Sequence, residues 1–250
     1  MADKGILPMK NIALKDLLEA GCHFGHQSNR WHPKAVSYIF DERDGVHIID
    51  LAKTKAGLIT AGEYLADLAK NDGKIIFVGV KRQAKAVVTE AAKKAGVYFV
   101  TERWPGGLLT NFSVMKRNLA RIEELKARST DTSYTKKERL LANRDMEKLL
   151  RVYEGLVGLD SLPNAVYLVD IKKMEGAARE AKATGVKMVA ITDTNADPTD
   201  IDYQIPANDD AVGSIKIITD YLADCWLEGK GKNKDNKNNK INKENEAHHS

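Results

Sequence analysis

The feature that most constrains the fold is an alternation of short apolar runs with amphipathic helical patterns over residues 73–193. The apolar runs are rich in β-branched residues, which is typical of strands that are buried on both faces. The helical patterns that follow two of these runs end at Gly96 and Gly185, as helices commonly do. This alternation predicts a mostly parallel, doubly wound α/β sheet with helices on both sides. The four runs are 74–80, 97–100, 165–170 and 186–192.

Shorter predicted elements extend this architecture in both directions. Asp44-Gly45 predicts the turn of a strand pair. Asn208 or Asp209 is the predicted N-cap of the last helix, and Gly229 follows the predicted end of that helix. Together with the alternating region, these elements predict one αβα domain. They are a helix at 13–20, strands at 36–40 and 46–49, a helix at 52–70 and a helix at 209–227.

An insert over residues 103–159 divides the predicted αβα domain into 1–102 and 160–228. It is far longer than the crossover helix that a parallel strand pair needs. Apolar residues recur at helical spacing on both sides of a polar break at 128–134, so we expect two helices in an antiparallel coiled-coil hairpin. Residues 103–154 carry 12 Lys or Arg against 7 Asp or Glu, whereas the whole chain has a net charge of only +4. The hairpin is either a surface for a polyanionic partner or a solvated helix pair without a partner.

Residues 229–250 form a tail rich in Asn and Lys. It carries 6 Lys against 3 Asp or Glu and a single isoleucine, Ile241. Such a segment cannot bury enough apolar surface to order itself, so we expect it to be disordered and flexible. Its role is either contact with RNA or simple solubilisation of the chain.

We expect the chain to be cytoplasmic. Two cysteines, Cys22 and Cys225, cannot build a disulfide framework, which fits a reducing compartment. No run approaches the ~18 apolar residues of a membrane span, so we expect no membrane partner. The first ten residues lack the apolar core of a secretion signal and the Arg-rich pattern of a transit peptide.

A nucleotide-dependent enzyme is the first hypothesis that a doubly wound sheet suggests. The turn after the first strand, Gly79 to Gln83, has neither of the glycine patterns that cradle phosphates. The glycine pair Gly106-Gly107 lies at the root of the hairpin and predicts a tight backbone bend. Because no acid/base pair or phosphate loop is visible, we expect no enzyme, small-molecule substrate or cofactor, although a cytosolic enzyme on this fold remains the alternative class.

Two histidines at a metal-like spacing, His23 and His26, and an acidic segment that begins at Asp193 could share a structural divalent ion. The other reading is that the histidines cap loops through hydrogen bonds while the aspartates cap turns. Elemental analysis of the chain and of a His26→Ala variant would decide between these readings.

Cations next to aromatic rings form the remaining chemical pattern. Arg30 and Trp31 share a Pro-stiffened loop with Lys34, and Arg103-Trp104 follows the strand at 97–100. Ligands of open α/β sheets collect at the carboxyl ends of strands. Cations there can neutralise phosphates while aromatic planes stack on unpaired bases, so this pattern is typical of RNA contact.

Several sequence blocks resemble one family closely, the bacterial-type ribosomal protein S-two of the small subunit. The resemblance covers nearly all of residues 11–229, and it leaves out the Asn/Lys tail. The blocks are LLEAGCHFGHQ (17–27), WHPK (31–34), GVHIIDL (45–51), FVGVKR (77–82), RWPGGLLTN (103–111), LPNA (162–165), DTNADP (193–198) and IPANDDA (205–211).

The resemblance implies a flavodoxin-like αβα domain with a protruding helical hairpin, in a component of the small ribosomal subunit that is not an enzyme. It further implies a ribosome-bound protein between head and body that contacts small-subunit ribosomal RNA and helps to anchor ribosomal protein S-one. A free-standing RNA-binding regulator is the second alternative class. The residues that we expect to contact RNA are Arg30, Trp31, Lys34, Lys81, Arg82, Arg103, Trp104, Asn111, Lys116, Arg117 and Arg121.

Overall fold

A computed structural model describes residues 12–247, with side chains described as far as residue 233. The parts of the predicted domain and tail at 1–11 and 248–250 lie outside the described residues. The helices are α1 (Leu14–Glu19), α2 (Leu51–Lys70), α3 (Arg82–Ala95), α4 (Phe112–Thr130), α5 (Lys136–Tyr153), α6 (Glu175–Thr184) and α7 (Val212–Ala247), with 3-10 turns η1 (Ser28–Arg30), η2 (Pro33–Tyr38) and η3 (Glu154–Leu156). The strands are β1 (Phe24–Gln27), β2 (Ile39–Arg43), β3 (Val46–Ile49), β4 (Ile75–Val78), β5 (Tyr98–Val100), β6 (Ala165–Leu168), β7 (Lys187–Thr192) and β8 (Tyr203–Pro206).

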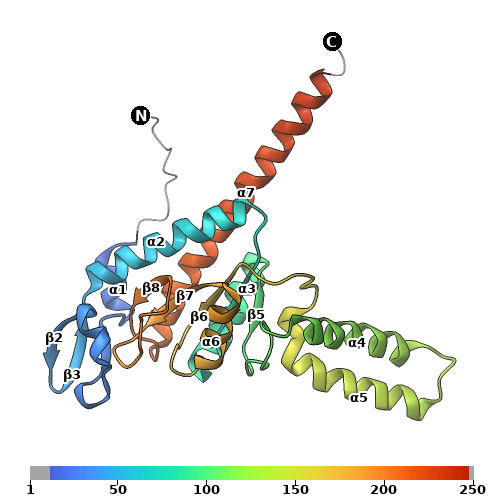
Figure 1. Ribbon diagram of the computed structural model, residues 1–250, viewed down its shortest axis with the longest axis horizontal. Coiled ribbons are helices and arrows are strands. Elements are labelled where there is room, and N and C mark those ends of the chain that lie inside the picture. Colours follow the sequence, from blue (N-terminus) through green and yellow to red (C-terminus); the bar gives the residue numbers. More distant parts are fainter. Residues whose placement is uncertain (1–11, 248–250) are drawn as a thin grey trace.

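Five strands form a parallel sheet in the order β5-β4-β6-β7-β8. The chain moves from β4 outward to β5 and then returns to the other side of β4 as β6, so the order of strands reverses between β4 and β6. Helices cover both faces of the sheet (Figure 1). The predicted three-layer α/β fold is therefore confirmed.

Alternate residues of each central strand face two different apolar layers. In β4, Ile75 and Phe77 pack with the buried faces of α2, α3 and α7. Ile76 and Val78 pack on the other side with α6 and with residues at the root of the hairpin. Because each strand is buried on both faces, its sequence is continuously apolar rather than alternating.

A small antiparallel sheet, in the order β1-β3-β2, lies at one end of the domain, and the α4–α5 hairpin projects from the other end (Figure 1). The strand predicted at 36–40 begins only at Ile39. The preceding residues form η2 instead, because Pro33 fixes its first turn and the His32 ring accepts a hydrogen bond from the backbone N–H of Lys34. Neither β1 nor β8 was predicted.

Helix α7 differs from the predicted helix at both ends. It begins at Val212 rather than near residue 209, because the Asn208 side chain first caps a turn through the N–H groups of Asp210 and Ala211. It continues to Ala247 and extends beyond the rest of the molecule (Figure 1). Gly229 does not end the helix. The flexibility of residues 229–250 stays a prediction.

The physical reason lies in the contact between α7 and α2. A Cβ atom on Gly229 would lie 2.2 Å from the backbone oxygen of Ala66. This glycine therefore lets two helices approach closely instead of stopping one of them. Among the described residues, no helix is both long and apolar enough to cross a membrane.

Candidate functional site

A buried ion-pair cluster occupies the carboxyl ends of the parallel strands, where ligands of this fold normally bind. Lys81 follows β4, and its Nζ lies 3.0 Å from Asp170 Oδ2, which follows β6. The same Nζ lies 2.6 Å from Asp209 Oδ1 and 2.7 Å from Asp210 Oδ1, in the segment after β8. Side chains of the protein itself thus occupy the end of the sheet between β4 and β6, where the order of strands reverses.

The structure places Lys81, one of the predicted RNA contacts, among carboxylates in the interior of the αβα domain. Its side chain is only 11% exposed, and three carboxylates surround its ammonium group. Sequence reasoning placed the residue at the correct end of β4 but could not show that aspartates from β6 and β8 converge on it. We therefore assign Lys81 to the interior cluster, and its contact with RNA stays a prediction.

The electrostatics of the cluster follow from its burial and its excess of carboxylates. Burial raises the pKa of Asp209 to about 7, and the neighbouring charges of Asp193 and Asp170 act in the same direction. Burial alone would lower the pKa of Lys81, but the carboxylates around it, Asp209 first, hold that pKa above its usual range. For Asp210, burial is outweighed by Lys81, so its pKa lies below the usual value.

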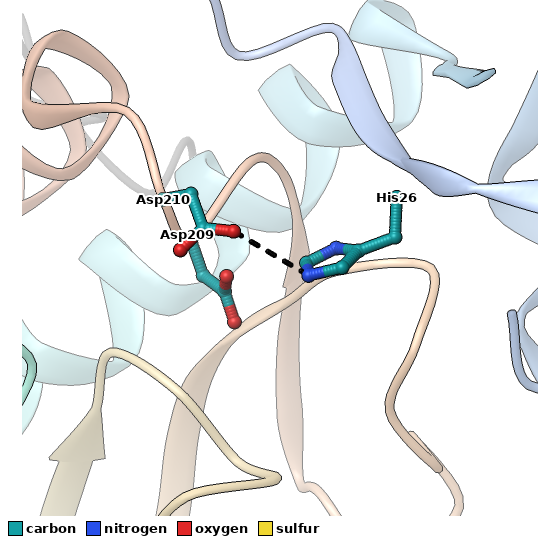
Figure 2. Close-up of side chains that lie close together, drawn as sticks. All are labelled: His26, Asp209 and Asp210. Atoms are coloured by element: carbon teal, nitrogen blue, oxygen red, sulfur yellow. Dashed lines mark ion pairs between the residues drawn. The ribbon is translucent and has the colours of Figure 1, made fainter. Parts of the chain in front are cut away.

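His26 reaches this cluster from β1 of the small sheet. Its Nδ1 lies 3.0 Å from Asp193 Oδ1, and its Nε2 lies 3.4 Å from Asp210 Oδ2. Figure 2 shows the ring edge of His26 facing Asp210, with the Asp209 carboxylate beside it. Contact with Asp193 raises the pKa of His26 above its usual value.

The local sequence explains how β1 comes so close. A Cβ atom on Gly25 would lie 2.8 Å from the side chain of Thr194. The backbone N–H of His26 donates a 2.9 Å hydrogen bond to the hydroxyl of that threonine. Glycine between the two histidines therefore lets the strand approach the segment after β7 closely enough for His26 to reach the aspartates.

The structure separates the two histidines that were predicted to act together. The ring of His23 lies tilted against that of Phe24, with ring centroids 4.0 Å apart, and among the described residues His23 does not belong to the group that could hold an ion. That group is His26, Asp209 and Asp210, whose candidate ligand atoms all lie within 4.8 Å of one another. Nitrogen and carboxylate oxygen donors of this kind suit a divalent ion such as Zn²⁺.

The acidic segment that begins at Asp193 does not form one cluster. Its remaining aspartates each pair with a separate lysine on the surface, as ordinary exposed ion pairs do. The three pairs are Asp197 with Lys34 at 2.7 Å, Asp200 with Lys182 at 2.6 Å and Asp202 with Lys187 at 2.6 Å.

Arg30, Trp31 and Lys34 lie exposed in the loop and 3-10 turns between β1 and β2. The edge of the Trp31 ring meets the ring of His47, with centroids 5.4 Å apart. Lys34 is partly neutralised by its ion pair with Asp197. The geometry leaves Arg30 and one part of Trp31 accessible to a partner.

A second group of predicted RNA contacts lies at the start of α3 and between β5 and the hairpin. Arg103 and Asn111 are exposed, and Arg82 is exposed at the start of α3. Trp104 is half-buried, and its Nε1–H donates a 3.1 Å hydrogen bond to Glu180 on α6. This hydrogen bond gives Trp104 a role at the root of the hairpin, and its contact with RNA stays a prediction.

The hairpin helices pack through a narrow apolar seam that includes Ile122 and Ala142. Lys116, Arg117 and Arg121 all lie exposed on α4 outside this seam. At the far end of the hairpin, Thr135 and Glu138 form a capping box that starts α5. The predicted cations thus lie on a helical element that projects from the domain (Figure 1).

Three residues with structural roles at these sites were missed by sequence reasoning: Asp170, Glu180 and Thr194. Asp170 directly follows an apolar strand, a signal that sequence reasoning used for Lys81 but not for this carboxylate. The role of Thr194 depends on β1, which was not predicted. Glu180 resembles any other charged residue of an amphipathic helix.

Comparison with known proteins adds an independent observation. A family model described as Ribosomal protein S2 matches residues 17–229. The chain belongs to the ribosomal protein S2 family. A Small ribosomal subunit protein uS2 from Dictyoglomus thermophilum is 48% identical over 225 residues, which are 89% of this chain and 92% of that protein. Proteins of the same name from Geotalea uraniireducens and Fusobacterium nucleatum are 46% and 44% identical, each over 88% of this chain and over 88% and 91% of their own lengths.

Membership in the ribosomal protein S2 family confirms the family resemblance seen in the sequence. Because the family is a structural and non-enzymatic one, it also confirms the prediction that the chain is not an enzyme. The cluster at the reversal point of the sheet fits this conclusion, since Lys81 and its aspartates occupy the place where an enzyme of this fold would bind its ligand.

Proposed function

We propose that this ribosomal protein S2 family member is a ribosome-bound, cytoplasmic component of the small ribosomal subunit that binds small-subunit ribosomal RNA. The proposal assigns the αβα domain, 1–102 and 160–228, as the body that carries the RNA-binding elements. The hairpin, 103–159, is the main RNA-binding arm. The tail, 229–250, has no assigned contact.

The observation that carries the proposal is the exposed cationic surface of α4 and of its root. Arg117 and Arg121 are one helical turn apart, so they share a face of α4. Lys116 lies beside them, with its Nζ 5.5 Å from the centre of the Phe112 ring. Such a surface neutralises phosphates without the narrow pocket that a small ligand requires. The residues proposed to contact RNA are Arg30, Trp31, Lys34, Arg82, Arg103, Asn111, Lys116, Arg117 and Arg121.

Incorporation into ribosomal subunits tests this proposal. The triple variant Lys116→Glu, Arg117→Glu, Arg121→Glu should remain near the top of a sucrose gradient. The wild-type chain should sediment with small subunits, at one copy per subunit. A matched control reverses three exposed lysines far from the hairpin, Lys15, Lys53 and Lys216. Equal incorporation of the two variants would contradict the role of the hairpin.

Stoichiometry separates the ribosomal role from that of a free-standing RNA-binding regulator. A structural component must be present once in every small subunit, whereas a regulator can be substoichiometric. Wild-type chain that stayed soluble in a gently prepared lysate would overturn the ribosomal proposal.

We also propose that the αβα domain contributes to anchoring ribosomal protein S-one. The support is a group of exposed apolar side chains on the small sheet and η2, which lie at the end opposite to the hairpin (Figure 1). Phe24, Val36 and Phe40 are 50%, 61% and 73% exposed. Large apolar side chains that a fold leaves exposed are available for contact with another protein.

Capture of purified ribosomal protein S-one by the immobilised chain tests the anchoring proposal. Phe40→Ser should weaken capture at least severalfold, because it removes the most exposed aromatic side chain of this surface. The control is Leu140→Ser, since Leu140 is also exposed but lies on α5. If both variants capture S-one as the wild type does, this surface is not the anchor.

Cation binding is a second candidate function, favoured by the convergence of His26, Asp209 and Asp210. A bound cation would neutralise the carboxylates of Asp209 and Asp210, which Lys81 neutralises in this structure. Equilibrium dialysis against Zn²⁺ should show one bound ion per chain and none for His26→Ala. The control is His23→Ala, since His23 lies outside the group. Absence of bound metal in the wild-type chain leaves hydrogen bonding and ion pairing as the only role of His26.

A further inference from the structure

Glu180 makes an unusual concentration of contacts with one loop. It lies on α6, in the αβα domain, whereas all of the donors below belong to the segment that precedes α4. Its Oε1 accepts hydrogen bonds from Trp104 Nε1 at 3.1 Å and from the Gly107 N–H at 2.8 Å. Its Oε2 accepts from the Leu109 N–H at 3.0 Å and, at 3.4 Å each, from the N–H and the hydroxyl of Thr110.

These hydrogen bonds combine charge with geometry. Backbone N–H groups of a bend point inward together, and a carboxylate is the acceptor that satisfies several of them at once. Burial alone would raise the pKa of Glu180, but the donors of Gly107, Leu109 and Trp104 hold it below its usual value. The carboxylate is thus ionised at neutral pH and gathers the loop around itself.

The loop leads directly into the hairpin. Asn111 immediately precedes α4, and its N–H donates a 2.7 Å hydrogen bond to the Gly107 carbonyl. Between these two residues, Leu108 and Leu109 are buried in the same apolar layer as Met115 of α4. The loop therefore joins the body of the αβα domain to the first turn of α4.

The other root of the hairpin is held by different contacts. Leu156 and Leu159, which follow α5, are buried in the apolar layer below the sheet. The hydroxyl of Tyr98 on β5 donates a 3.0 Å hydrogen bond to the Gly158 carbonyl. The hairpin is consequently fixed at two points, and on the α4 side one carboxylate, that of Glu180, accepts the hydrogen bonds of the loop beside the buried contacts of Leu108 and Leu109.

We propose that Glu180 is the positioning residue that fixes the orientation of the hairpin relative to the αβα domain, through the N–H groups of residues 107–110. For RNA binding, this rests on the proposed function of the hairpin. Glu180 itself contacts no RNA in this proposal. It holds the exposed cations of α4 in one direction before RNA binds. Binding then costs less conformational entropy, because the hairpin is already ordered.

The test uses the full chain with Glu180→Gln. Glutamine has nearly the same size as glutamate, but it carries no charge. Its amide N–H₂ group cannot accept hydrogen bonds from the N–H donors of the loop. We expect the Gly107, Leu109 and Thr110 amides to exchange with solvent about tenfold faster, which corresponds to the loss of roughly one charge-assisted hydrogen bond. Spin labels at Thr132→Cys near the hairpin tip and Glu90→Cys on α3 should report a broader distance distribution.

Two further variants control this experiment. Glu175→Gln changes an exposed carboxylate of the same helix and should leave the exchange rates and the distance distribution unchanged. Trp104→Phe keeps an aromatic ring but removes one donor, so it should produce a smaller change in the same direction and serves if Glu180→Gln does not fold. Unchanged amide exchange of the sheet strands establishes that the fold is intact.

The outcomes separate the two proposals. Wild-type exchange rates and distances in Glu180→Gln would overturn the positioning role. A mobile hairpin with weaker binding to a small-subunit ribosomal RNA fragment, by about fivefold or more, would support both proposals. A mobile hairpin with unchanged RNA affinity would support the positioning of the hairpin by Glu180 and would contradict the RNA-binding role of the hairpin.

Discussion

The ammonium group of Lys81 lies 2.6 Å from the carboxylate of Asp209, although the two residues are 128 positions apart in the chain. One follows the first strand of the parallel sheet and the other follows the last. Asp170 and Asp210 complete the surroundings of the ammonium group. The carboxyl ends of three strands are thus tied together by one cation.

Replacing Lys81 should destabilise the protein strongly. Lys81→Met keeps most of the aliphatic stem but leaves carboxylates buried without their cation. Loss of one partner of a buried ion pair costs about 3 to 5 kcal/mol, so the midpoint of urea unfolding should fall markedly.

Lys85→Met is the matched control for this change. Lys85 lies one turn further along the chain and pairs with Glu102 at 2.9 Å on the surface. An exposed pair contributes about 1 kcal/mol or less. Similar unfolding midpoints for the two variants would show that the buried cluster does not depend on Lys81.

Two glycines of α7 should respond to alanine in opposite ways. Gly229→Ala places a Cβ atom 2.2 Å from the Ala66 carbonyl oxygen, so we expect a loss of about 1 to 3 kcal/mol from overpacking. Gly231 has no atom within 4 Å of its Cβ position, so Gly231→Ala should instead stabilise the helix by about 0.5 to 1 kcal/mol. The midpoint of thermal unfolding measures the change in stability of each variant. Stabilisation by both substitutions would mean that α2 and α7 do not approach each other here.

Binding to RNA should depend on salt through the hairpin. Each phosphate contact contributes about 0.7 to 0.9 to the slope of log affinity against log salt concentration. The triple variant Lys116→Gln, Arg117→Gln, Arg121→Gln should therefore lower the slope by about 2 to 3. Filter binding of a ribosomal RNA fragment at several salt concentrations measures this. Lys15→Gln is the control, and a wild-type affinity that did not change with salt would contradict ionic recognition.

Neither cysteine should react readily with a thiol reagent in the folded protein. Burial raises the pKa of Cys225 to about 12 and also raises the pKa of Cys22. A raised thiol pKa lowers the fraction of reactive thiolate at pH 8, so modification should become fast only after unfolding in urea. Rapid labelling of two thiols per native chain would contradict this burial.

The sequence specified the local elements well where one physical signal dominated. The helices predicted to end at Gly96 and Gly185 do end there, with both glycines in the left-handed region. Helical periodicity and glycine conformation act within a few neighbouring residues, so a linear sequence displays them.

Contacts between distant segments required the tertiary structure. By charge alone, Lys81 and Arg82 are two neighbouring cations, yet one lies in a buried carboxylate cluster and the other is exposed. Glu180 and Gly229 likewise acquire their roles from a loop 70 to 76 positions away and from the backbone of α2. The sequence by itself determined the layered α/β architecture, the helical insert and the family, because these depend on local periodicity and on contiguous motifs. Only the tertiary structure decided which charges are neutralised in the interior, because burial and pairing depend on how the strand ends converge in space.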